Sequence, residues 1–323
     1  MLFSRLTDFQ IANSSGVCGN SSHKELMIQD LFIMKSYSLS MVVIFSVANI
    51  MLAILSSCGN ALVFLTVVSF SELLISSNIG LASLAAANFF EGVLIHCLCA
   101  QGSFLVLEDG CPLPTLELKI VQFLTNIFVY SAVLNLALVT LERYVGIIHS
   151  LRYHAILSRR RMVNFIFSIW FASLFISVPS LFDNAAINNI SNSVMTVTLI
   201  TALVVTFYFN LTIHHASLRQ RRVVRAQEQM MRQFAAINQQ RYRFRGAKTM
   251  LFIFVTLVLC FMPAVAARII PPHSAESRML RAWSGTIFGL HSSISPFVYF
   301  FRCTELRRYT HKLLRRGLRI LKV

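Results

Sequence analysis

The chain has 323 residues, of which 56% are hydrophobic and only 13% are charged. Soluble domains usually carry about 25% charged residues, so this composition excludes an ordinary soluble fold and requires much of the apolar surface to face lipid. The formal net charge of +16 could suit nucleic acid, but the cations cluster between apolar runs. We therefore expect lipid headgroups and a partner on one side of a membrane to meet this charge, and no nucleic acid.

The N-terminal segment, residues 1–39, is mixed and polar, without the apolar core and cleavage site of a secretory signal peptide. Asn-X-Ser/Thr triplets begin at Asn13 and Asn20, which predicts glycosylation if this segment is extracellular. The seven cysteines are too few and too scattered for a disulfide scaffold. Cys58 and Cys260 lie inside apolar runs and are predicted to be buried thiols.

Seven apolar runs follow. A bilayer core of about 30 Å needs roughly 20 apolar residues per helix. The last run is the weakest by hydropathy, but its small and hydroxyl residues suit a helix that packs among other helices. No internal repeat is found, which argues mildly against transporters built from inverted halves. We predict an all-α seven-transmembrane helix bundle over 40–301, with spans at about 40–68, 77–101, 119–142, 163–182, 194–217, 247–270 and 282–301.

The distribution of cations predicts the orientation of the bundle. With the N-terminus outside, 22 basic residues lie on the inner side and 7 on the outer side, as expected for cytoplasmic loops. Residues 1–39 are therefore predicted to be extracellular and residues 302–323 cytoplasmic. A third glycosylation triplet, at Asn189, falls in the predicted outer loop between the fourth and fifth spans.

Two basic segments complete the predicted inner side. The connector 219–245 has neither glycine nor proline and either extends the fifth and sixth helices or forms a solvated charged face. In the tail, apolar residues follow one helical stripe among cations, which is typical of an amphipathic helix that lies in the membrane interface. The stripe consists of Leu306, Tyr309, Leu313 and Leu314.

Six short motifs occur in order, each in its own span. The first two are "GNALVFLTV", which contains Asn60, and "NIGLASLAAANFF", which contains Asn88. The third span ends in "LERYVGI", and the fourth contains Trp170. The sixth contains "CFMP" and the seventh "SPFVY". Together these motifs resemble those of the rhodopsin-like (class A) G-protein-coupled receptors, and the resemblance covers residues 40–316.

The resemblance implies a switch at the inner end of the third span. In this family the arginine, here Arg143, is held by its acidic neighbour, here Glu142, and is released toward the G protein when the sixth helix swings outward. A charge near hydrocarbon needs a partner, so such a restraint is physically reasonable. Leu151 would be the apolar residue that inserts into the G protein. The remaining switch residues implied by the resemblance are Tyr144, Tyr208 and Tyr299.

Several positions depart from the family pattern. Asn88 stands in place of the carboxylate that commonly holds a sodium ion, and Ala132 in place of a serine, so no sodium regulation and no other metal is expected. Glu91 lies one helical turn away. It is either neutral and hydrogen-bonded, with His291 as a candidate partner, or paired with His291 as a pH-sensitive element. The activation core implied by the resemblance is Asn60, Asn88, Phe261, Pro263, His291, Ser295 and Pro296.

The usual disulfide of the family is not expected. Leu118 occupies its position in the third span, and the second outer loop has no cysteine. Cys18 and Cys111 are our choice for a substitute bridge. The missing disulfide and the missing proline of the fifth span resemble the melanocortin, lysophospholipid, cannabinoid and adenosine receptor group. The stretch "SLRYHAILSRR" resembles odorant receptors, which stay open as an alternative.

The ligand class is constrained mainly by what is missing. Thr125 stands where amine receptors have a carboxylate, and Gly289 stands where opsins have a lysine. The family analogy implies a mostly apolar cavity that suits a small ligand, although these side chains could equally be ordinary core packing. The implied pocket is Thr125, Asn126, Val129, Phe261, Val265 and Phe288.

The sequence predicts a plasma-membrane receptor without chemistry of its own or a cofactor. It would bind an extracellular small-molecule or peptide ligand and activate a heterotrimeric G protein. No nucleotide loop or nucleophile constellation suggests an enzyme. A transporter or channel is the rival class, but only Glu91 and His291 place charge deep in the spans. A decoy receptor that does not signal is a third possibility, because Asn88, Phe261 and Ser295 depart from the family pattern.

Overall fold

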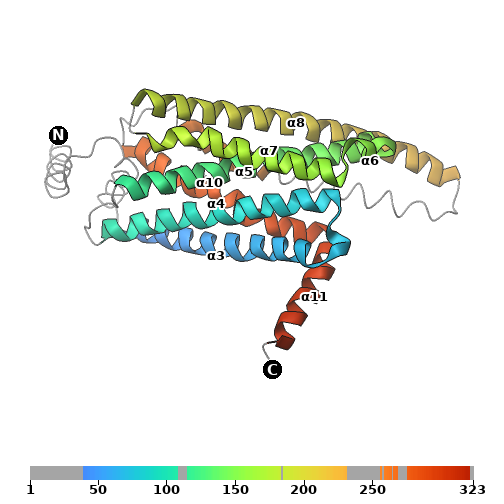
Figure 1. Ribbon diagram of the computed structural model, residues 1–323, viewed down its shortest axis with the longest axis horizontal. Helices are drawn as coiled ribbons and strands as arrows, with labels where there is room; N and C mark the ends of the chain where they lie inside the picture. Colours follow the sequence, from blue (N-terminus) through green and yellow to red (C-terminus); the bar gives the residue numbers. More distant parts are fainter. Residues whose placement is uncertain are drawn as a thin grey trace.

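The computed structural model describes residues 39–107, 115–182, 185–230, 255–256, 258–263, 265–267 and 275–320. Long helices lie side by side along the longest axis of the molecule, and α11 leaves this bundle at a steep angle (Figure 1). The long elements are α3 (Leu39–Ser69), α4 (Ser76–Leu107), α5 (Thr115–Ile148), α7 (Arg159–Ser177), α8 (Ala185–Met230), α10 (Ala275–Arg302) and α11 (Thr304–Ile320). The short ones are η1 (Ser71–Leu73), η2 (Ser150–Arg152), α6 (Tyr153–Ile156) and η3 (Val178–Leu181).

Among the described residues, five segments are long and apolar enough to cross a membrane. They lie in α3, α4, α5, α7 with η3, and α8, and they confirm the first five predicted spans. The sixth predicted span is described only in part, and residues 258–263 and 265–267 are helical. The seventh corresponds to α10, which is too polar to qualify by composition. The polar side chains of α10 described between residues 284 and 295 are buried, as expected for a helix that packs among other helices.

Several serine and threonine hydroxyls of the spans donate to carbonyls within their own helices. A lipid environment offers no water to backbone or hydroxyl groups, so the hydrogen bonds of a span must be internal. The Thr140 hydroxyl donates to the Leu136 carbonyl at 2.8 Å, and the Ser103 hydroxyl donates to the Cys99 carbonyl at 2.8 Å. Such bonds to the preceding turn allow serine and threonine to lie inside an apolar helix.

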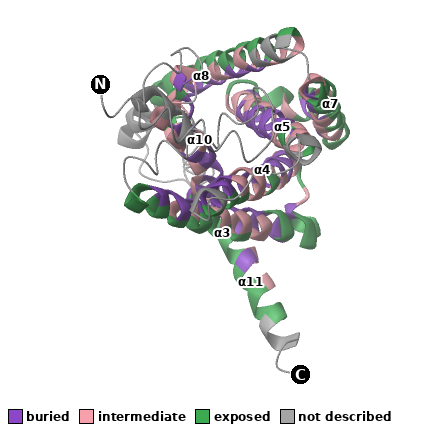
Figure 2. Ribbon diagram, turned by 90° about the vertical axis from the view of Figure 1, so that its left-hand side faces the viewer, coloured by how far each residue is buried: buried purple, intermediate pink, exposed green. Residues whose placement is uncertain are grey.

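Buried residues line the interior of the bundle, and exposed residues lie on its outer faces (Figure 2). Many of these exposed residues are large and apolar. Phe167 and Phe171 of α7, for example, are 73% and 65% exposed. This arrangement fits a molecule whose outer surface meets hydrocarbon. Cys260 is buried as predicted, but the prediction for Cys58 is wrong, because its side chain lies on the exposed face of α3. Apolar neighbours in sequence do not reveal which side of a lipid-facing helix a residue occupies.

Helices α3, α4 and α10 pack closely where each presents a glycine. A Cβ on Gly59 of α3 would lie 2.9 Å from Pro296 Cγ of α10, and one on Gly289 would lie 2.8 Å from His96 Nε2 of α4. A Cβ on Gly92 of α4 would overlap the Ser56 hydroxyl of α3. Small residues let helix backbones approach in a membrane, and here they bring polar side chains of three helices together.

The tail forms the predicted amphipathic helix, α11, which contacts the C-terminal end of α3. Leu306 is buried, and the ring of Tyr309 lies 4.9 Å from the ring of Phe70. The hydroxyls of Thr66 and Thr310 are 3.0 Å apart. Leu314 of the predicted stripe is exposed, so the contact with the bundle uses only the N-terminal part of that stripe.

Candidate functional site

The C-terminal end of α5 carries the predicted ion pair. Arg143 Nε lies 3.4 Å from Glu142 Oε2, and the side chains are 29% and 5% exposed, respectively. The carboxylate is therefore shielded by the protein, while the guanidinium reaches the surface. This geometry is consistent with an arginine restrained by its acidic neighbour, although the proposed release of Arg143 requires a second state of the molecule.

A tyrosine that sequence reasoning missed completes this pair. The Tyr153 hydroxyl, from the short helix α6, donates to Glu142 Oε1 at 2.7 Å. Burial, and then the Glu142 carboxylate, raises the pKa of Tyr153 well above its usual range. The phenol therefore keeps its proton and remains a donor at neutral pH. The basic stretch after Arg143 contained this tyrosine, but only the turn between α5 and α6 brings it back to Glu142.

The other predicted switch residues occupy different environments. The ring of Tyr144 lies 5.0 Å from the ring of Phe209 in α8. Leu151 is fully exposed in η2. Tyr208 is 60% exposed, whereas Tyr299 is 3% exposed. The structure therefore does not bring Tyr208 and Tyr299 into one buried cluster, and their switch roles stay predictions.

Asn60 joins α3 to α10 in the middle of the bundle. Its side-chain amide donates to the Ser56 carbonyl at 2.9 Å and to the Ser292 carbonyl at 2.8 Å. The Ser56 hydroxyl in turn lies 3.1 Å from the Ser292 hydroxyl and donates to the Asn88 carbonyl at 3.2 Å. These contacts connect α3, α4 and α10 through polar atoms that are shielded from lipid.

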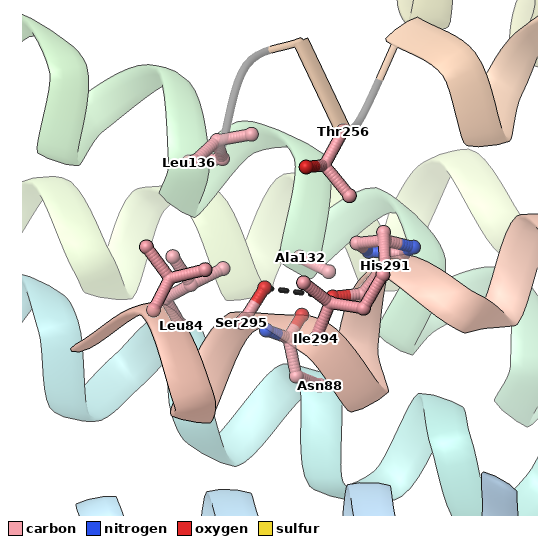
Figure 3. A pocket seen from close by; sticks show the side chains of 9 residues that line it. Leu84, Asn88, Ala132, Leu136, Thr256, His291, Ile294 and Ser295 are labelled. Carbon is pink, nitrogen blue, oxygen red and sulfur yellow. Dashed lines mark hydrogen bonds between the residues drawn. The ribbon is translucent and has the colours of Figure 1, made fainter. Parts of the chain in front are cut away.

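A small cavity lies next to this connection, at the side chain of Asn88 (Figure 3). Its volume is about 10 Å³ for the centre of a water-sized sphere, which is room for about one water molecule. Neither polar atom of the Asn88 side chain has a hydrogen-bond partner among the described residues. The cavity is lined by Leu84, Asn88, Ala132, Leu136, Thr256, His291, Ile294, Ser295 and Val298.

Glu91 and His291 form a second acid–base pair, deep inside the bundle. His291 Nε2 of α10 lies 3.5 Å from Glu91 Oε2 of α4, and the side chains are 7% and 0% exposed, respectively. The other ring nitrogen, Nδ1, donates to the Phe288 carbonyl at 2.6 Å. The contact between Glu91 and His291 that the sequence suggested is therefore present, and the two side chains face each other from different helices.

Two phenylalanines cover the imidazole of this pair. The ring centroid of His291 lies 5.5 Å from that of Phe261, in the sixth span, and 5.5 Å from that of Phe288. The two phenylalanine rings are 4.4 Å apart. Phe261 is completely buried. The sixth span thus contacts the acid–base pair through an aromatic side chain rather than through a charge.

A neighbouring polar cluster was also missed by sequence reasoning. His96 Nδ1 of α4 donates to Asn49 Oδ1 of α3 at 2.9 Å, and the Asn49 amide donates to Thr286 Oγ1 of α10 at 2.9 Å. All three side chains are buried. A histidine and an asparagine inside apolar runs are a usable signal, because polar groups in a membrane span need partners.

The predicted ligand-pocket residues are brought together only in part. Phe261 and Phe288 are in contact, and Val129 is buried in the same core cluster. The Thr125 hydroxyl is buried without a hydrogen-bond partner among the described residues. Asn126 accepts a hydrogen bond from the Gln122 amide at 2.9 Å. The cavity at Asn88 is much smaller than a drug-sized ligand requires, so the pocket stays a prediction.

Some predicted residues cannot be placed. Asn13, Asn20, Cys18 and Cys111 lie outside the described residues. Asn189 lies near the start of α8 rather than in a loop, so the predicted outer loop is shorter than the sequence indicated. The helix begins early because the polar residues at 185–193 have no proline or glycine to interrupt it.

A bundle of long apolar helices, five of them long enough to cross a membrane among the described residues, defines a multi-pass membrane protein. The sequence model of the protein family "7 transmembrane receptor (rhodopsin family)" matches residues 59–299 of the chain. The chain therefore belongs to this family of G-protein-coupled signalling receptors, which are not enzymes, and has a seven-transmembrane bundle.

Several curated receptors are similar to the chain. Melatonin receptor type 1A of Gallus gallus is 26% identical over 272 residues, covering 79% of this chain and 76% of that receptor. Melanocortin receptor 3 of Rattus norvegicus is 26% identical over 277 residues, covering 81% and 83%. Melatonin receptor type 1A of Mus musculus is 32% identical over 123 residues, and this match spans only 34% of that receptor's length.

Proposed function

We propose that the chain is a plasma-membrane receptor with its N-terminus outside, which converts binding of a small extracellular ligand into activation of a heterotrimeric G protein on the cytoplasmic side. Outward movement of the sixth span would open the inner mouth of the bundle. The observation that carries this proposal is the restrained arginine: Arg143 lies beside Glu142, which Tyr153 holds from the other side.

The geometry supports this role for physical reasons. Glu142 is enclosed and accepts a short hydrogen bond, whereas Arg143 keeps contact with the surface. The pair is only partly buried, because the Arg143 side chain is 29% exposed, so a helix movement can separate it without leaving the guanidinium in a dry interior. Leu151, fully exposed nearby in η2, would offer an apolar contact to the G protein once Arg143 is released.

The ligand class follows from the side chains near Phe261. Val129, Phe261 and Phe288 are apolar and buried, and the predicted pocket adds the Thr125 hydroxyl and the Asn126 amide. An uncharged ligand with few hydrogen-bonding groups fits such a site better than an amine or an anion. Among the ligands named by the similar receptors, melatonin meets this description, and it is the first compound to test, followed by melanocortins.

The test is guanine-nucleotide exchange in membranes from cells that express the full chain. We expect GTPγS binding above the level of untransfected membranes, with Arg143→Ala reducing it to that level. Arg160→Ala, an exposed arginine at the start of α7, is the matched control and should leave exchange unchanged. Exchange that is equal in wild type and Arg143→Ala, with and without melatonin or melanocortins, would contradict the proposal, provided that surface expression is equal.

A further inference from the structure

Glu91 is a carboxyl group in a place where a lone negative charge is very costly. Its side chain is fully buried in α4, and neither carboxyl oxygen has a hydrogen-bond partner among the described residues. Charges inside a membrane span are expensive and are normally paired or neutralised. Within the described part of the chain, His291 is the basic group that faces it, at 3.5 Å.

The hydrogen bond of His291 to its own helix determines what its other nitrogen can do. The Phe288 carbonyl only accepts, so Nδ1 carries a proton and donates it at 2.6 Å. In a neutral imidazole the second nitrogen, Nε2, is then an acceptor. If Glu91 is ionised and His291 is neutral, then Nε2 of His291 and Oε2 of Glu91 are both acceptors, and they face each other without a proton between them. The contact is favourable only when one additional proton is held between them, on either the carboxyl or the imidazole.

Burial restricts the pair to this single proton. With two protons the pair would carry a net positive charge, and with none a net negative charge. Each net charge would be buried between α4 and α10, which costs several kcal/mol in a low-dielectric interior. The state with one proton is neutral overall, whether it is a protonated carboxyl beside an imidazole or a carboxylate beside an imidazolium.

The surrounding groups do not offer a competing charge. Among the described residues, the nearby titratable groups are His96 of α4, which interacts electrostatically with His291, and Cys260 of the sixth span, which interacts with Glu91. His96 already donates its Nδ1 proton to Asn49. Helix α3 contributes the neutral hydroxyl of Ser56, and the residues that α5 places on the cavity beside His291 are Ala132 and Leu136, which do not titrate.

We propose that Glu91 and His291 form a binding site for one proton, which is held while Phe261 covers His291 and is released to water when the sixth span moves away. The second half of this statement rests on the proposed receptor function. Phe261 is the contact that makes the coupling possible, because its buried ring lies 5.5 Å from the imidazole. Removing that ring would admit water to the pair.

The direction of the pH effect follows from counting protons. In water an imidazole loses its proton near pH 6.5 and a carboxyl group near pH 4.3, so the opened pair holds no additional proton above about pH 6.5. The closed pair holds one. Raising the pH therefore favours the open state, by up to about tenfold per pH unit for one proton. Basal G-protein activation should rise with pH, and acidification should suppress it.

The experiment compares wild type with Glu91→Gln. Glutamine has nearly the same shape, and its amide can donate to His291 Nε2 without titrating. We would measure GTPγS binding at pH 6, 7 and 8 in membranes, subtracting the signal of Arg143→Ala at each pH. We expect wild-type exchange to rise by up to about tenfold from pH 7 to pH 8 and Glu91→Gln exchange to stay flat. His96→Gln, which changes the other buried histidine of this region, should keep the wild-type slope.

A second measurement tests the proton site without signalling. Unfolding also exposes the pair, so above about pH 6.5 the folded protein holds one more proton than the unfolded chain. Stability should then be full at low pH and fall as the pH rises. The melting temperature of the purified full chain in detergent should fall from pH 6 to pH 8 in wild type and much less in Glu91→Gln.

The possible outcomes separate the two ideas. If the melting temperatures of wild type and Glu91→Gln change in parallel with pH, the proton site is overturned. It is also overturned if His96→Gln removes the dependence of the melting temperature on pH and Glu91→Gln keeps it. If Glu91→Gln removes the melting slope but exchange is absent at every pH, the proton site is supported and the receptor function is contradicted. If exchange is present but independent of pH in wild type, release on activation is overturned.

Discussion

Two acid–base pairs lie at different depths of the same bundle, and their basic partners differ. Glu91 and His291 are 0% and 7% exposed, whereas Glu142 and Arg143 are 5% and 29% exposed. The distances between the nearest atoms are almost the same, 3.5 Å and 3.4 Å. Distance alone therefore does not distinguish the pairs, but access to water does.

The choice of base matches that access. A guanidinium stays charged under all ordinary conditions, which is tolerable for Arg143 because its side chain reaches the surface. An imidazole can be neutral or charged, so His291 can keep the interior pair neutral by sharing a proton with Glu91. The comparison teaches that the Glu142–Arg143 pair is suited to separation by movement, whereas the Glu91–His291 pair is suited to gain and loss of a proton.

The largest expected effect is the removal of the interior base. His291→Ala leaves Glu91 without its partner in a fully buried site, and breaking a buried pair costs about 3–5 kcal/mol. We expect a marked fall in the melting temperature of the purified receptor. His154→Ala, an exposed histidine of α6, should change stability by less than about 0.5 kcal/mol. Equal melting of the two variants would show that the interior pair does not stabilise the bundle.

Close packing around the interior pair should be the next most sensitive feature. Gly92 lies one residue from Glu91, and a Cβ there would overlap the Ser56 hydroxyl. Overpacking typically costs about 1–3 kcal/mol, so Gly92→Ala should lower the melting temperature. Gly285→Ala is the matched control, because a Cβ at that α10 position meets nothing within 4 Å, and it should stabilise by about 0.5–1 kcal/mol. A Gly92→Ala variant as stable as Gly285→Ala would contradict the close approach of α3 and α4.

A smaller effect is expected at the Glu142–Arg143 pair. Tyr153→Phe removes the hydrogen bond to Glu142 Oε1, which contributes about 1 kcal/mol for a half-buried donor. The resting arrangement loses this bond, so basal GTPγS binding should rise about fivefold at most. Tyr309→Phe keeps the ring contact with Phe70 and should leave basal exchange unchanged. A decrease in Tyr153→Phe would mean that the bond belongs to the active state.

The smallest expected effect is that of pH on the Tyr153–Glu142 hydrogen bond, which should not change between pH 6 and pH 8. Burial and the Glu142 carboxylate raise the pKa of Tyr153. The protonated phenol therefore stabilises the folded protein fully below the usual tyrosine pKa of about 10, and this stabilisation is lost only at higher pH. The ratio of Tyr153→Phe to wild-type exchange should therefore be the same at pH 6 and pH 8. A ratio that changes across this range would place a titrating group at the inner mouth and weaken the contrast with Glu91 and His291.

Much of the fold could be predicted because the lipid environment makes the signal local. A run of about 20 apolar residues is a property of the chain alone, and the first five predicted spans agree with helices. Predictions that depended on which way a side chain faces were less secure. Cys58 is exposed rather than buried, and Asn189 lies in a helix rather than in a loop. In both cases the identity of the neighbours in sequence was compatible with either outcome.

By itself, the sequence determined the helical class, the adjacency of Glu142 and Arg143, and the presence of a few ionisable residues within apolar runs. Hydropathy and adjacency need no partner from elsewhere in the chain. Only the tertiary structure decided that His291 faces Glu91, that Tyr153 turns back to Glu142, and that His96 bonds to Asn49. The cost of burying a polar group depends on what surrounds it, and here the surroundings come from different helices.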